Sequence, residues 1–205
     1  YNNVSSKNCS DYVMEKVLNE RSIVVLGSSE LSFSNSPAYP PKLFNYGNSD
    51  FNMVLMGSGY FQCIPQAINV GALSNNIKNN KIVLIISPQW FTSDGLTSES
   101  FCSKFEETNF VEFLKNDSIS KETRIAVANR VNELLTSDPT TLARVEKDER
   151  LYIDGSLNLL THLEMAAYNS FRAEKAKFET AHALKSQDLP IEQERYVKAE
   201  DINWN

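Results

Sequence analysis

The chain has 205 residues, of which 41% are hydrophobic and 22% are charged, a balance typical of a globular protein rather than a disordered or collagen-like one. Its formal net charge of -6 disfavours a nucleic-acid-binding protein, because such proteins usually carry a basic field that neutralises phosphates. No apolar run approaches the roughly 20 residues that a membrane-spanning helix requires.

Three segments are rich in Val, Ile and Leu without polar alternation, which is typical of buried strands in a parallel sheet. They are predicted at about residues 22–27, 51–57 and 81–87, and each ends near a breaker, at Gly27, Gly57 and Pro88. Helical spacing of apolar residues predicts helices over 11–20, with Ser10 as N-cap, and over 64–77. The alternation predicts an α/β fold, a parallel sheet with flanking helices in a three-layer, SGNH- or flavodoxin-like arrangement.

After the third strand the pattern becomes helical, which predicts a large helical insertion. Helices are expected over 100–115, over 121–135 after a Ser120 cap, and over 157–184. The last of these carries an apolar stripe that is predicted to be a packing face: Leu160, Leu163, Ala167, Phe171, Phe178 and Ala181.

Three parts are therefore predicted along the chain: an α/β part over 1–95, a helical insertion or cap over 96–190, and a tail over 191–205. The segment 34–50, which contains three prolines, is expected to be a long ordered loop near the end of the first strand. With only three strands in view, the sheet is expected to be incomplete in this chain, and the start at Tyr1 suggests that an upstream segment has been removed.

Polar motifs follow all three predicted strands. They are GSSELS at 27–32, GSGYFQ at 57–62 and SPQWF at 87–91. Ligands of open α/β sheets bind at the carboxyl ends of the strands, so the three motifs are predicted to surround one site.

The three cysteines, Cys9, Cys63 and Cys102, are widely spaced and include no CxxC pair. This pattern predicts neither a zinc site nor a disulfide framework, and we expect isolated thiols that are buried or half-buried. No metal and no cofactor are predicted.

Four motifs in order carry a resemblance to a known family. VLGSSEL at 25–31, YPPKLFN at 39–45, GSGYFQ at 57–62 and VLIISPQWF at 83–91 together resemble the D-alanyl transfer (DltD) family, which attaches D-alanine to lipoteichoic acid. That family is similar to the SGNH hydrolases, in which a serine after the first strand attacks an acyl carbon. The resemblance implies that Ser29 is the nucleophile.

A serine hydroxyl needs a base and oxyanion donors before it attacks an acyl carbon at neutral pH. A tight turn after Gly27 is expected to expose the Ser29 hydroxyl and to point its backbone N–H into the site. Gly59 is the candidate second donor, because glycine permits close approach of the backbone. The remaining candidates for oxyanion or substrate contacts are Ser28, Gln62, Gln89 and Trp90.

The catalytic base is not identified within the chain. The only histidines, His162 and His182, lie inside the long helical pattern, and neither matches the Asp-x-x-His arrangement that the family carries near its C-terminus. The predicted explanation is that the aspartate and histidine belong to a C-terminal part that this chain lacks, so that the chain alone is inactive.

The resemblance implies serine-dependent transfer of D-alanine from an acylated carrier or membrane-protein donor to lipoteichoic acid. It also implies a protein held at the outer face of the cytoplasmic membrane by an N-terminal helix that this chain lacks. Two alternatives stay open: a generic SGNH-like esterase or O-acyltransferase of another cell-envelope polymer, and a non-catalytic module that docks a carrier through its helical half.

Overall fold

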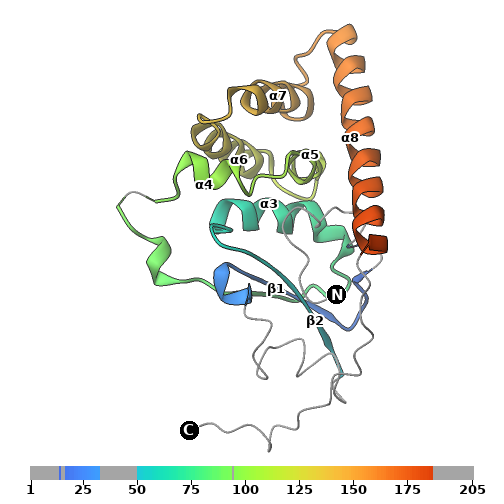
Figure 1. Ribbon diagram of the computed structural model, residues 1–205. Coiled ribbons are helices and arrows are strands. Elements are labelled where there is room, and N and C mark those ends of the chain that lie inside the picture. The colour runs from blue at the N-terminus through green and yellow to red at the C-terminus, as the bar shows by residue number, and fades with distance from the viewer. Residues whose placement is uncertain (1–13, 15–16, 33–49, 94, 187–205) are drawn as a thin grey trace, which may run out of the picture.

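The computed structural model describes residues 14, 17–32, 50–93 and 95–186 (Figure 1). The predicted helix over 11–20, the loop over 34–50, the tail over 191–205 and Cys9 lie wholly or largely outside the described residues. So do the side chains after residue 181, including that of His182.

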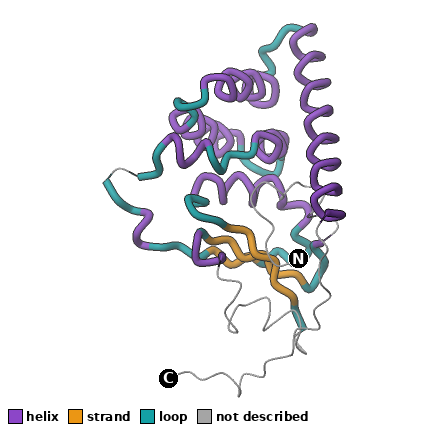
Figure 2. Tube along the Cα trace, in the orientation of Figure 1, coloured by secondary structure: helices purple, strands orange, loops and turns teal. Residues whose placement is uncertain are grey.

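A three-stranded parallel sheet forms the lower layer of the described molecule (Figures 1 and 2). Strands β1 (Ser22–Gly27), β2 (Asn52–Gly57) and β3 (Ile82–Leu84) lie in the order β2-β1-β3. The β1–β2 register runs from Ser22 opposite Asn52 to Gly27 opposite Gly57, so both strands end at the same level. The predicted class, a parallel α/β sheet with flanking helices and a helical insertion, is confirmed.

The third strand differs from its prediction. It spans three residues instead of seven, and Ile82, Val83 and Leu84 are all exposed rather than buried. No side chain of β3 belongs to a hydrophobic cluster of the described structure, whereas β2, which also lies at an edge of the sheet, contributes Val54 and Met56 to the core beneath α3. The apolar run of residues 81–87 therefore predicted a strand correctly, but the prediction that this strand is buried was wrong.

Helix α3 (Cys63–Leu73) lies between the sheet and the other helices (Figure 1). On its sheet side Leu73 joins a core with Val24 and Leu26 of β1 and Val54 and Met56 of β2. On its other side Ile68 joins a second core formed by the later helices. One helix thus belongs to both cores, and it holds the helical layer over one face of the sheet.

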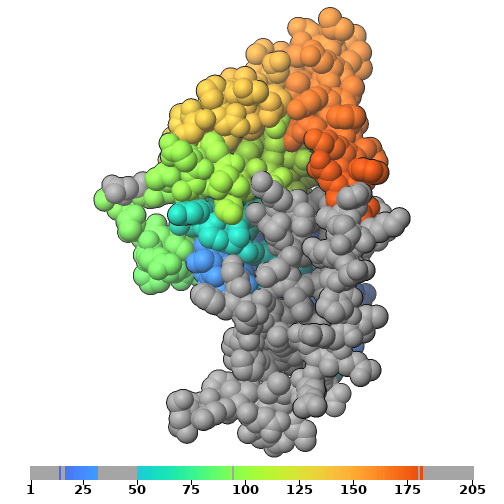
Figure 3. Space-filling model, in the orientation of Figure 1, coloured from blue at the N-terminus to red at the C-terminus, as the bar shows by residue number. Residues whose placement is uncertain are grey.

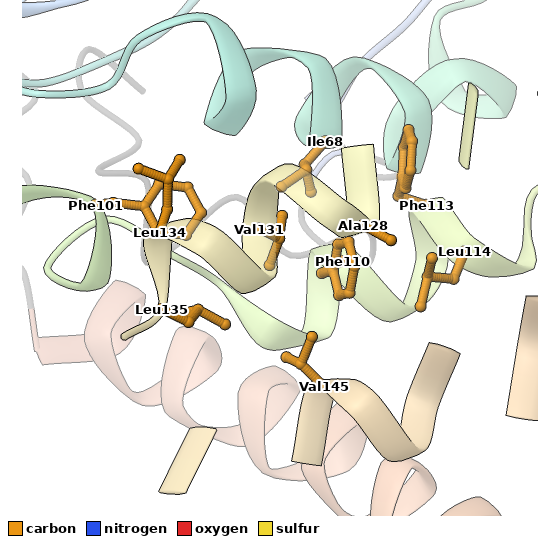
Figure 4. Packing of buried hydrophobic residues seen from close by; sticks show 10 residues of the cluster. All are labelled: Ile68, Phe101, Phe110, Phe113, Leu114, Ala128, Val131, Leu134, Leu135 and Val145. Atoms are coloured by element: carbon orange, nitrogen blue, oxygen red, sulfur yellow. The ribbon is translucent and has the colours of Figure 1, made fainter. Parts of the chain in front are cut away.

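The helical layer contains five α-helices and one short π-helical segment among the described residues. They are α4 (Ser98–Cys102), α5 (Glu107–Lys115), α6 (Lys121–Leu134), α7 (Pro139–Glu149), the π-helical segment (Arg150–Asp154) and α8 (Leu159–Ser186). Figure 4 shows the apolar side chains that α3, α4, α5, α6 and α7 contribute to their shared core.

Two helix predictions differ from the structure. The predicted helix over 100–115 is broken at 103–106 into α4 and α5, because Phe105 turns inward between the rings of Phe101 and Phe110, at centroid distances of 5.3 and 5.6 Å. Helix α7 was not predicted, although the pair Asp138-Pro139 is a usual helix start. The Asp138 carboxylate accepts a hydrogen bond from the Thr141 N–H at 3.0 Å and caps this helix.

Ionic and polar contacts join α8 to the rest of the helical layer. The Glu107 carboxylate on α5 pairs with Arg144 of α7 at 3.0 Å and with Arg172 of α8 at 2.8 Å. Nearby, the Asn169 amide on α8 donates to the Asp148 carboxylate on α7 at 2.6 Å. These contacts lie on the inner face of α8 together with the buried Met165.

The apolar stripe of α8 lies on the opposite, outer face. It was predicted to be a packing face, but Leu160, Leu163, Phe171 and Phe178 are exposed in the described structure. The prediction was wrong because α8 docks through a mixed face of Met165, polar and charged side chains, while its apolar spacing follows the other side of the helix.

Candidate active site

The three motifs meet at the carboxyl edge of the sheet, as their positions after parallel strands predicted. Gly27 and Gly57 are paired across β1 and β2, and the Ile85 N–H donates to the Leu26 carbonyl at 2.8 Å, which continues the β1–β3 pairing towards SPQWF. The chain after β1 turns directly into a 3-10 helix (Ser29–Ser32), and SPQWF forms another (Pro88–Trp90). The ends of all three strands therefore open on one edge of the sheet.

Ser28 is a structural residue in this arrangement. Its side chain is buried, and its hydroxyl donates to the Ser58 carbonyl at 3.1 Å, which joins the turn after β1 to the turn after β2. Its backbone N–H donates to the Glu30 carboxylate at 2.6 Å. Because both donors of Ser28 are occupied, neither is available to an oxyanion in this state.

Ser29 differs from its neighbour in both respects. It is the first residue of the 3-10 helix and is exposed, whereas Gly27 and Ser28 are buried. Among the described residues, its hydroxyl has no hydrogen-bond partner. The structure thus separates the two serines of GSSELS, with the Ser29 hydroxyl open to a substrate and the Ser28 hydroxyl in an internal contact.

The two glycines at the end of β2 and in the following turn differ in the space that a Cβ would have. A Cβ built on Gly57 lies 2.6 Å from the Gly27 carbonyl oxygen, so only glycine fits where the two strand ends approach. A Cβ built on Gly59 meets no atom within 4 Å. The positive φ in this turn belongs to Tyr60, at 68°, and not to the candidate donor Gly59.

A buried glutamine that the motifs did not identify connects the same two turns. The Gln66 amide donates to the Gly27 carbonyl at 3.2 Å and to the Phe61 carbonyl at 3.1 Å. Gln62, which was predicted as a site residue, is half-buried and precedes α3 without making a side-chain cap. The only signal for Gln66 in the sequence was a polar residue, together with Asn69, in the otherwise apolar first turns of the predicted helix.

The third motif has one buried and one exposed aromatic residue. Trp90 is only 7% exposed, while Phe91 and Gln89 are exposed. Because Trp90 is buried, Phe91 is the exposed aromatic ring of this motif. The parts that Gln89 and Trp90 play in binding stay predictions.

No histidine lies beside Ser29 among the described residues. His162 sits near the start of α8, at the end of the molecule farthest from the turn after β1 (Figure 1). This separation agrees with the expectation that His162 is not the base. Across the described part of the chain, no three His, Cys, Asp or Glu side chains gather as a metal site would require.

The cysteines of the described part are free thiols. Cys102 is half-buried, as expected, but Cys63 is exposed at the first position of α3 and contradicts the expectation of burial. The first residue of that helix faces away from both cores, which is why it is open.

Two cavities of the described part of the chain lie in the helical layer. One of about 340 Å³ lies between α5 and α8 beside Tyr152, and one of about 620 Å³ lies beside the Glu107 ion pairs. Neither includes a residue of the three motifs. No helix among the described residues has the length and apolar character needed to cross a membrane.

Comparison with known proteins assigns the family. The family model described as DltD protein matches residues 2–205, which is almost the entire chain. The chain belongs to the DltD family. This membership confirms the resemblance that the four motifs carried.

Curated DltD proteins of three bacteria are similar to parts of the chain. Protein DltD of Staphylococcus aureus (strain NCTC 8325 / PS 47) is 30% identical over 107 residues, which are 52% of this chain and 27% of that protein. Protein DltD of Bacillus subtilis (strain 168) is 29% identical over 121 residues, 58% of this chain and 31% of that protein. Protein DltD of Lacticaseibacillus rhamnosus is 25% identical over 126 residues, 62% of this chain and 29% of that protein. The matched part of the chain thus spans less than a third of the length of each DltD relative.

Proposed function

We propose that this chain forms the nucleophile-bearing part of an enzyme that transfers D-alanine to lipoteichoic acid, with Ser29 as the nucleophile. The observation that carries the proposal is the contrast between the two serines after β1. Ser29 is exposed on the carboxyl edge of the sheet, and Ser28 is buried and bound to the Ser58 carbonyl. Membership of the DltD family supports the choice of substrate.

In the proposed reaction, the Ser29 oxygen attacks the carbonyl carbon of a D-alanyl thioester. The serine proton passes to a base, the thiolate leaves and takes up a proton, and D-alanyl-Ser29 remains as an ester. A hydroxyl of lipoteichoic acid then attacks this ester, and the Ser29 oxygen regains its proton as the new ester forms. The donor is an acylated carrier or membrane protein on the outer face of the membrane.

Two backbone groups are proposed to stabilise the oxyanion. The Ser29 N–H begins the 3-10 helix, and the Gly59 N–H lies on the turn after the neighbouring strand, where a Cβ built on Gly59 meets no atom within 4 Å. Gln66 acts as a positioning residue, since its amide holds the carbonyls of Gly27 and Phe61 on both sides of the site. The base and its carboxylate partner are proposed to come from a part of the full-length protein that lies beyond the described residues.

Replacement of single residues in the full-length protein tests this function in cells. We expect Ser29→Ala to remove most D-alanine ester from lipoteichoic acid, whereas Ser28→Ala retains transfer because its hydroxyl serves only the contact with Ser58. Esters are measured by alkaline release of D-alanine, and protein levels by immunoblotting. If Ser29→Ala left the ester content unchanged at normal protein level, the chain would be a docking module and the proposal would be wrong.

A further inference from the structure

Glu30 is a charged residue of the candidate active site that the proposed reaction does not use. It is the only residue with a charged side chain in the three motifs GSSELS, GSGYFQ and SPQWF. It follows Ser29 directly and lies in the 3-10 helix after β1. Figure 3 shows blue atoms of residues 17–32, the segment that includes this helix, at the surface of the drawn face. The three motifs thus carry a single negative charge, next to the proposed nucleophile.

The fold holds the Glu30 carboxylate in place through one of its oxygens. The Oε1 atom accepts a hydrogen bond from the Ser28 N–H at 2.6 Å. A Cβ built on Gly27 would lie 2.5 Å from the same oxygen, so glycine at this position leaves the space that the carboxylate occupies. The Ser28 N–H and the Ser29 N–H belong to consecutive peptide units. The carboxylate is therefore fixed one peptide unit away from the proposed oxyanion donor.

The second oxygen of this carboxylate is not engaged by the described part of the chain. The Oε2 atom of Glu30 has no hydrogen-bond partner among the described residues, and none of their lysine, arginine or histidine side chains forms an ion pair with it. Glu30 is half-buried, and an unpaired carboxylate in such a place has lost part of its hydration. A cationic group of a bound substrate would compensate for that loss with a charge-assisted hydrogen bond.

We propose that Glu30 is a specificity-determining residue that binds the α-ammonium group of the D-alanyl unit, an inference that rests on the proposed acylation of Ser29. In D-alanyl-Ser29 the ammonium nitrogen is two bonds from the acyl carbon, whose oxygen binds the Ser29 N–H in the proposed reaction. The ammonium group is thereby confined to the vicinity of the peptide units beside which the Glu30 carboxylate lies. The ammonium is the only charge of the acyl unit, so one carboxylate distinguishes D-alanyl from neutral acyl groups.

Acylation of the full-length protein by two thioesters tests the proposal. A D-lactyl thioester has nearly the size and shape of the D-alanyl thioester, with a hydroxyl in place of the ammonium group. The rate of Ser29 acylation by each is measured by mass spectrometry, with Ser29→Ala as the blank. We expect Glu30→Gln to lower the ratio of the D-alanyl rate to the D-lactyl rate at least about 10-fold, because glutamine keeps an acceptor for the Ser28 N–H and loses only the charge.

The ratio of rates separates specificity from other effects of the substitution. Comparison of this ratio between variants cancels the intrinsic reactivities of the thioesters and the fraction of folded protein. Glu20→Gln is the matched control, because Glu20 is an exposed carboxylate just before β1, at the opposite end of that strand, and its variant should keep the parent ratio. An unchanged ratio in Glu30→Gln, whether both rates fall or neither does, would overturn the proposal. Absence of Ser29 acylation by either thioester in the parent protein would refute the proposed function, and this inference with it.

Discussion

Substitution of Gly57 by alanine tests whether the close approach of β1 and β2 builds the candidate site. Gly57 is the last residue of β2 and is paired with Gly27 at the end of β1. A Cβ at Gly57 lies 2.6 Å from the Gly27 carbonyl oxygen, where ordinary van der Waals contact begins at 3.4 Å. It also lies 2.8 Å from the Gly27 carbonyl carbon and from the Leu31 side chain. Backbone atoms on the facing strand cannot rotate away, so the two strand ends must separate.

The expected cost follows from this geometry. Overpacking of an extra methyl group against a rigid neighbour costs about 1–3 kcal/mol, and the lower backbone entropy of alanine in the unfolded chain returns about 0.4–1 kcal/mol. We therefore expect Gly57→Ala to lower the free energy of unfolding by about 1–2 kcal/mol. For a protein of this size each kcal/mol lowers Tm by about 2–4 °C, so Tm falls by about 2–8 °C.

Urea unfolding followed by circular dichroism measures this cost, and Gly59→Ala is the matched control. A Cβ on Gly59 meets no atom within 4 Å, so this substitution should change the free energy of unfolding by no more than about 0.5 kcal/mol. Because separation of the strand ends also moves Ser29, Gly57→Ala should reduce acylation of Ser29 more than Gly59→Ala does. Equal stability of the two variants would refute the argument from close approach.

Three further predictions concern the helical layer. Burial raises the pKa of Asp148 to about 6, whereas the unfolded carboxyl titrates near 3.9. The free energy of unfolding should therefore fall by up to about 3 kcal/mol as the pH rises from about 4 to 6. Asp148→Asn should remove this loss when urea titrations at the two pH values are compared. Glu107→Gln should lower the free energy of unfolding by about 2 kcal/mol, because Arg144 and Arg172 lose their shared carboxylate, and a charge swap at the exposed Glu133 serves as the control. Ser120→Ala should cost about 1 kcal/mol through loss of the cap on the Thr123 N–H, and a thermal melt that matches the parent would contradict that role.

The sheet could be predicted from the sequence because local and tertiary signals agreed there. The runs at 22–27 and 51–57 are mostly apolar, and each ends on a glycine. The close pairing of the strand ends requires that glycine at Gly57. The relation of the three motifs followed from topology alone, since carboxyl ends of parallel strands share one edge. The choice of Ser29 over Ser28 came from the family resemblance, and the burial of Ser28 agrees with it.

Burial could not be predicted where it depends on neighbours rather than on the segment itself. The sequence of β3 is as apolar as that of β1, but β3 is exposed and its side chains join no hydrophobic cluster of the described structure. The stripe of α8 has the spacing of a packing face, yet ion pairs of Arg172 and the Asn169 hydrogen bond fix the opposite face against the layer. The spacing of apolar residues does not reveal polar contacts of this kind, and for the same reason Gln66 was not identified.

Direct detection of D-alanyl-Ser29 tests the central claim most closely. The full-length protein is incubated with a D-alanyl thioester, quenched in acid and digested, and the peptide that contains Ser28 and Ser29 is sequenced by tandem mass spectrometry. We predict one D-alanyl ester on the Ser29 oxygen, lost in Ser29→Ala and retained in Ser28→Ala. An ester on any other residue, or D-alanine transfer to lipoteichoic acid by the Ser29→Ala protein at the parent rate, would contradict the account.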